Sequence, residues 1–185
     1  MRLFDISVLG WIHSAACMVA LIAAPFVFAL RKGTRRHRTL GYWYVGSMVI
    51  ANVTALGLFA PIEGLPAFNM FHWMAIATLL FIGLGVWAAR NQRAWLGAYG
   101  HPVMMVLSFY MLAGGAVNEA FSRIGALREA AMAGSPWAHT IAQTRMLGMA
   151  QGSTMLLAFV MMVWLVAGVA RTRARRRRMH LAPAE

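Results

Sequence analysis

The chain has 185 residues, of which 61% are hydrophobic and only 12% charged, and its mean hydropathy is +0.63. Soluble domains carry about a quarter charged residues, so this composition excludes an ordinary soluble domain. The formal net charge of +12 raises nucleic-acid binding as a function. The cations, however, stand at the ends of apolar segments, which makes nucleic-acid binding a poor second explanation and predicts no nucleic-acid partner.

Five apolar segments are each long enough to cross about 30 Å of hydrocarbon. They cover residues 8–30, 41–61, 68–89, 98–118 and 147–170. We therefore expect an all-α polytopic membrane protein, with residues 1–170 forming a single bundle of five transmembrane helices in contact with the lipid bilayer. Short connections make spans 1 to 4 antiparallel neighbours.

The basic residues predict the orientation. Thirteen of the 17 lysines and arginines fall in the first and third connections and in the tail at 171–185. Such an excess is typical of cytoplasmic segments. We expect the N-terminus outside, the C-terminus in the cytoplasm, and a multi-pass protein of the bacterial inner membrane. The basic tail would also lie near anionic headgroups.

Residues 119–146 form the one long connection, which is alanine-rich, amphipathic and interrupted at Gly134-Ser135-Pro136. Ser135 suits an N-cap and Pro136 a first helical position, so we expect a second helix to begin there. The segment would then be an outer helical hairpin between spans 4 and 5. A solvated surface is the favoured interpretation; a cover for a site or a docking element is the alternative.

Four histidines lie near the predicted membrane boundaries. His13 in span 1 and His72 in span 3 are expected at matching depth near the outer side, and His37 and His101 near the cytoplasmic side. An ionisable residue in a bilayer is costly and is a functional hypothesis by default. The plain alternative is that each imidazole only hydrogen-bonds a neighbouring helix or headgroup water.

Imidazoles from separate helices are how helical bundles hold haem b. The pattern therefore predicts one haem between His13 and His72 and a second between His37 and His101. Small residues below His13 leave room for a flat cofactor or a close helix, with Cys17 as a small packing residue among them. Copper is the alternative cofactor, held at the outer mouth by four candidate ligands: His13, His72, Glu63 and Glu119. Binding of no cofactor also stays open.

The stretch "HRTLGYWY", with His37, Arg38 and Gly41, together with the span-1 histidine His13, resembles an uncharacterised group of bacterial predicted inner-membrane proteins. Members look like small bundles with a His-Arg-x-x-Gly inner loop and a later His-x-x-Trp-Met. Here the latter corresponds to residues 101–105, with Met104 in place of the tryptophan. The resemblance covers about residues 8–118 and implies no known function. A looser similarity in architecture links the chain to di-haem b-type cytochrome bundles, which implies electron transfer across a membrane.

Two functions follow as hypotheses. The first is a haem b-binding redox subunit that exchanges electrons with a quinone or an extracytoplasmic partner. The alternative is a non-enzymatic membrane subunit for transport, metal (copper) handling or complex assembly. Whether the chain is an enzyme stays open, although it lacks a Ser-His-acid arrangement or a His-Glu-x-x-His motif for hydrolysis.

Overall fold

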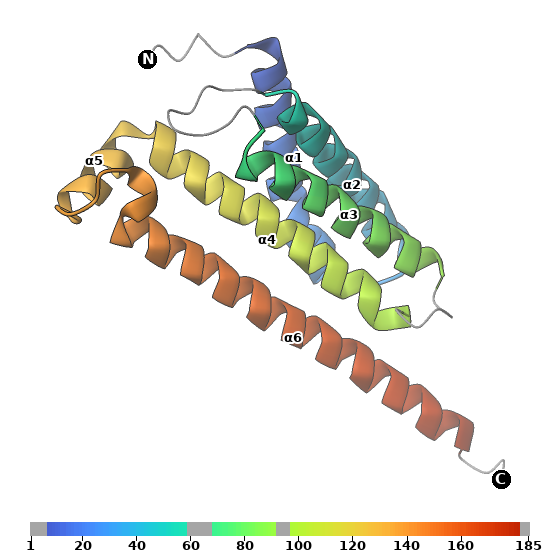
Figure 1. Cartoon of the computed structure of the whole chain (residues 1–185). Helices are drawn as coiled ribbons and strands as arrows, with labels where there is room; N and C mark the ends of the chain where they lie inside the picture. The colour runs from blue at the N-terminus through green and yellow to red at the C-terminus, as the bar shows by residue number, and fades with distance from the viewer. Residues whose placement is uncertain (1–6, 59–67, 92–96, 182–185) are drawn as a thin grey trace. The chain divides into compact units, whose positions relative to one another are not determined.

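The structure is a computed structural model that describes residues 7–58, 68–91 and 97–181 (Figure 1). This part of the chain is all-helical and contains no strand, as the sequence predicts. The elements in chain order are α1 (Val8–Ala29), α2 (Arg35–Leu56), α3 (Met70–Arg90), α4 (Gly97–Arg123), α5 (Gly125–Ala133), the short 3₁₀ helix η1 (Ile141–Gln143) and α6 (Arg145–Leu181).

The contacts divide the chain into two compact units. One comprises Met1–Ile82 with Met111–Ala113, and the other Gly83–Tyr110 with Gly114–Glu185. Helices α1 and α2 belong to the first unit and α5 and α6 to the second, whereas α3 and α4 contribute residues to both. The single bundle that the sequence predicts therefore stays a prediction.

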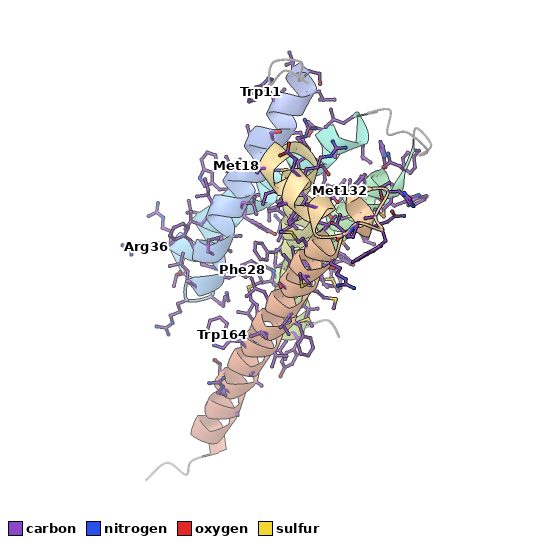
Figure 2. The ribbon with its side chains drawn as sticks, turned by 90° about the vertical axis from the view of Figure 1, so that its left-hand side faces the viewer. Trp11, Met18, Phe28, Arg36, Met132 and Trp164 are labelled. Carbon is purple, nitrogen blue, oxygen red and sulfur yellow. The ribbon has the colours of Figure 1, made fainter. Side chains whose placement is uncertain are left out.

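Helices α1 and α2 pack against each other as a hairpin (Figure 1). One side of α1 carries small buried residues at helical spacing: Ala16, Ala20, Ala23 and Ala24. Small side chains let two helix backbones approach closely. Phe28 and Tyr44 meet edge to face near the end of the hairpin, with ring centroids 6.3 Å apart. In Figure 2 Trp11 and Phe28 mark the two ends of α1.

The turn between α1 and α2 is built from local hydrogen bonds. The Lys32 ammonium donates to the carbonyl of Phe28 at 2.9 Å. Gly33 has φ +81°, a left-handed conformation that glycine adopts without steric cost. Thr34 is the N-cap of α2, because its hydroxyl accepts the His37 N–H at 3.2 Å. Helix α2 consequently begins at Arg35, earlier than the predicted start at residue 41.

Four of the described helices are long and apolar enough to cross a membrane. Their ranges are Val8–Ala29, Met70–Arg90, Tyr99–Arg123 and Arg145–Thr172. Helix α2 is not among them, since it starts with three arginines within four residues and carries polar Ser47, Asn52 and Thr54. The chain is thus a membrane protein whose apolar helices contact the lipid bilayer. Five spans and the orientation of the termini stay predictions.

In the second unit, the segment after α5 differs from the expected second helix. The break is where the sequence indicates, since α5 ends at Ala133, but Pro136 lies in a turn and no helix begins there. The expectation that Ser135 is an N-cap of a local helix is wrong. Its buried hydroxyl instead accepts the main-chain N–H of Arg145 at 3.1 Å, at the first residue of α6. The Arg145 guanidinium also lies 4.4 Å from the Trp137 ring centroid.

Candidate functional site

His13 is held to the neighbouring helix through one ring nitrogen. Its Nδ1 lies 2.8 Å from the carbonyl oxygen of Ala51 in α2. A carbonyl only accepts, so Nδ1 must carry a proton and donate it. The same carbonyl accepts the Thr54 hydroxyl at 2.9 Å. In a neutral imidazole this arrangement places the lone pair that can bind a metal on Nε2.

Cys17 lies one helical turn beyond His13 and brings a sulfur to that second nitrogen. The Cys17 Sγ is 3.6 Å from the His13 Nε2. A tetrahedral zinc ion with bonds of about 2.05 Å to nitrogen and 2.3 Å to sulfur would separate the two donors by about 3.6 Å. The sequence predicts a packing role for Cys17 and does not predict this pair. The spacing of four residues on a helix was the signal that could have found it.

His72 is the most deeply buried of the four histidines, with 2% of its surface exposed. Its ring stacks on Phe68, with centroids 4.7 Å apart and planes inclined by 29°. The main-chain N–H of Asn69 donates to the His72 Nδ1 at 3.2 Å, while the Asn69 side-chain oxygen accepts the N–H of Phe71 at 3.0 Å. Asn69 and His72 therefore cap the N-terminus of α3 together, as the two residues of a capping box do.

The Asn69 side-chain oxygen also lies 3.3 Å from the His72 Nδ1. Two protonation patterns fit these distances. Either Nδ1 accepts from the Asn69 main chain and the proton is on Nε2, or Nδ1 donates to the Asn69 side chain and Nε2 carries the lone pair. Only the second pattern suits a metal ligand.

His37 contacts the end of α1. Its Nδ1 donates to the carbonyl of Val27 at 3.1 Å. That carbonyl belongs to the last turn of α1, where carbonyl groups lack a helical donor. Lys32 donates to the next carbonyl, that of Phe28, and burial beside the helix end lowers the pKa of the Lys32 amine below its ordinary 10.5. Two basic side chains thus cap α1.

His101 makes the corresponding contact between α4 and α3. Its Nδ1 donates to the carbonyl of Gly85 at 2.8 Å. A Cβ atom at Gly85 would overlap the Met105 side chain and lie 3.1 Å from the Cβ of Met104. The glycine therefore allows α4 to approach α3 closely where the histidine donates. Met104, which stands where the resemblance expects tryptophan, lies at this approach.

The two histidine pairs predicted from the sequence differ in how their members are divided between the units. His13, His37 and His72 belong to the first unit and His101 to the second. His13 contacts α2 and Cys17, whereas His72 contacts Phe68 and Asn69 at the beginning of its own helix. The pairings His13 with His72 and His37 with His101 both stay predictions.

The two acidic candidates do not strengthen the outer metal site. Glu63 lies outside the described residues. Glu119 is exposed and forms an ion pair with Arg123 one turn further along α4. Across the described parts of the chain, no group of three or more His, Cys, Asp or Glu side chains could hold a metal ion together.

Comparison with known proteins yields one match. The model of a family described as "predicted membrane protein (DUF2306)" matches residues 10–142, a range that includes α2 to α5 and nearly all of α1 but leaves out α6. No curated protein and no solved structure matches the chain. The matched range exceeds half of the sequence and contains all four histidines discussed above. The chain therefore belongs to the DUF2306 family of predicted membrane proteins, whose function is unknown.

Proposed function

We propose that the protein is a haem b-binding redox subunit of the bacterial inner membrane, in which His13 and His72 would hold the haem. One observation carries the proposal. His13 donates its Nδ1 proton to a main-chain carbonyl of the adjacent helix, which is how histidine ligands of metals are usually oriented. His37 and His101 make the same type of bond and stay candidates individually, because they belong to different units.

The residues around the two proposed ligands have separate roles. The Ala51 carbonyl fixes the plane and protonation of the His13 ring. The Asn69 side chain would accept the Nδ1 proton of His72, which would leave on Nε2 the lone pair that binds a metal. Phe68, stacked on the His72 ring, excludes water on that side. Haem b supplies one-electron transfer at a potential that its axial ligands and their surroundings set.

The experiment is a visible absorption spectrum of the full chain purified from haem-replete cells. We expect a Soret band that is lost in His13→Ala and in His72→Ala. His139→Ala is the matched control, because His139 is exposed in the segment after α5. A colourless preparation, or a Soret band that survives both substitutions, would overturn the proposal.

The topology forms part of the proposal. Five spans, with α2 as the second, place the basic residues around 31–38 and the tail on the cytoplasmic side. A fluorescent protein fused to the C-terminus should then fold and fluoresce, since that end would be cytoplasmic. If the fluorescent protein stays dark at the C-terminus and a periplasmic reporter fused at the same position is active, the orientation is the reverse.

A second function, the handling of copper or zinc, is favoured by the distance between Cys17 and His13. Thiolate and imidazole together suit these metals. In this case the purified chain would contain metal without a Soret band, and Cys17→Ser would lower the metal content. For haem b the outcome differs, because Cys17→Ser would leave the Soret band in place.

A further inference from the structure

One side of α2 contains a groove that neither proposed function uses. Its lining residues follow one face of the helix: Thr39, Tyr42, Trp43, Gly46, Ser47 and Ile50. The groove has a volume of about 380 Å³. The space beside Gly46 is open, because a Cβ atom there would meet nothing within 4 Å. Ser47 is buried, whereas Tyr42 and Trp43 are exposed.

Two arginines stand at the end of this groove. Arg35 and Arg36 precede Thr39 by four and three residues, so helical periodicity puts them on the same face, one turn away. Both are exposed, and Figure 2 shows Arg36 at the edge of the ribbon with its side chain pointing outward. Within the described residues the one ion pair joins Arg123 to Glu119, so neither arginine is neutralised by a carboxylate there.

We propose that this groove binds one anionic phospholipid, with the phosphate at Arg35 and Arg36 and an acyl chain along Gly46. The order of these residues along α2 matches the order of the layers of a bilayer from headgroups to hydrocarbon. Arginines stand at headgroup level, Tyr42 and Trp43 follow at the level where aromatic residues gather, and the groove continues toward the apolar middle of the helix.

Charge decides between a lipid and a second copy of the chain. In a two-fold dimer about an axis normal to the membrane, the same residues meet at the same depth. Arg35 and Arg36 of one copy would then face those of the other, and like charges repel. A phosphate complements the same pair of arginines, so the basic end of the groove favours the lipid.

The test is native mass spectrometry of the full chain in detergent, with phosphatidylglycerol or phosphatidylcholine added. We expect one phosphatidylglycerol to be retained in preference to phosphatidylcholine. The double variant Arg35→Gln/Arg36→Gln should weaken retention of phosphatidylglycerol about 30-fold, because each arginine near an anionic headgroup contributes about 1 kcal/mol. Arg171→Gln/Arg173→Gln removes the same charge from α6 and should leave this lipid bound.

The groove itself is tested by filling it. Gly46→Leu should expel the lipid, and the open space around Gly46 lets the variant fold. Gly41→Leu is the matched control, since Gly41 is equally open but does not line the groove. Equal retention of the two lipids, or equal effects of Gly46→Leu and Gly41→Leu, would overturn the proposal. A dimer that Gly46→Leu dissociates would assign the groove to a second copy instead. No readout involves haem or metal, so failure here is distinct from failure of the proposed function.

Discussion

His37 and His101 make the same hydrogen bond at two places, yet they stabilise the protein differently. Each donates Nδ1 to a main-chain carbonyl of the preceding helix. The acceptor of His37, the Val27 carbonyl, is in the last turn of α1 and lacks a helical donor. The acceptor of His101, the Gly85 carbonyl, lies inside α3, where the N–H of Ala89 is the regular helical donor.

The two hydrogen bonds therefore have different effects: one satisfies a carbonyl that lacks a helical donor, and the other adds a donor to a carbonyl that already has one. His37 supplies a hydrogen bond that the end of α1 would otherwise miss, at a turn also held by Lys32 and Thr34. His101 adds a second donor to a carbonyl that is already satisfied, and the contact there depends on close packing over Gly85. We therefore expect packing to dominate at Gly85 and hydrogen bonding to dominate at Val27.

The largest expected effect is at Gly85. Gly85→Val would push against Met105 and the Cβ of Met104, and overpacking of this kind costs about 1–3 kcal/mol of unfolding free energy. Thermal unfolding of the full chain in mild detergent measures the loss. Gly83→Val is the matched control, because a Cβ atom at Gly83 meets nothing within 4 Å. Equal stability of the two variants would show that the close approach contributes nothing.

The next effect is at His37. His37→Ala leaves the Val27 carbonyl without its donor, and an unsatisfied polar group that is largely buried costs about 1.5 kcal/mol. The same unfolding measurement detects it. His139→Ala serves as the control for loss of an imidazole, since His139 is exposed. An unchanged unfolding temperature would mean that water satisfies Val27 as well as His37 does.

The smallest effect is at His101. His101→Ala removes a second donor from Gly85 and should cost about 0.6 kcal/mol, the average found for hydrogen bonds between membrane helices. Measured beside His37→Ala, this variant tests the comparison directly. A greater loss for His101→Ala than for His37→Ala would reverse the roles assigned to the two histidines.

The sequence predicts the helices better than it predicts the contacts of the histidines. Long apolar runs mark the spans, because burying apolar residues in lipid needs about 20 of them. The start of α2 is missed because Thr34 caps a first turn made of arginines, which hydropathy alone assigns to a loop. The hydrogen bond of Ser135 is not predicted for another reason: its partner Arg145 is ten residues away across a turn.

For the candidate site, the depth of the histidines in the membrane stays a prediction, and their hydrogen bonds could not be predicted. The acceptors of His13 and His101 are 38 and 16 residues away, so they depend on how two helices pack. The capping role of His72 was accessible in principle, since Asn69 stands three residues earlier in a local pattern. The pair of His13 and Cys17 was likewise visible in the spacing.

The two hydrogen bonds that tie α1 to α2 also bear on how the protein enters the membrane. Helix α2 is less apolar than α1, and alone it gains little from leaving water. The bond from His13 to Ala51 and the bond from His37 to Val27 join the helices near both ends. Forming them before or during insertion satisfies polar groups that lipid cannot. We expect the translocation machinery to release α1 and α2 into the bilayer together, as a preassembled hairpin.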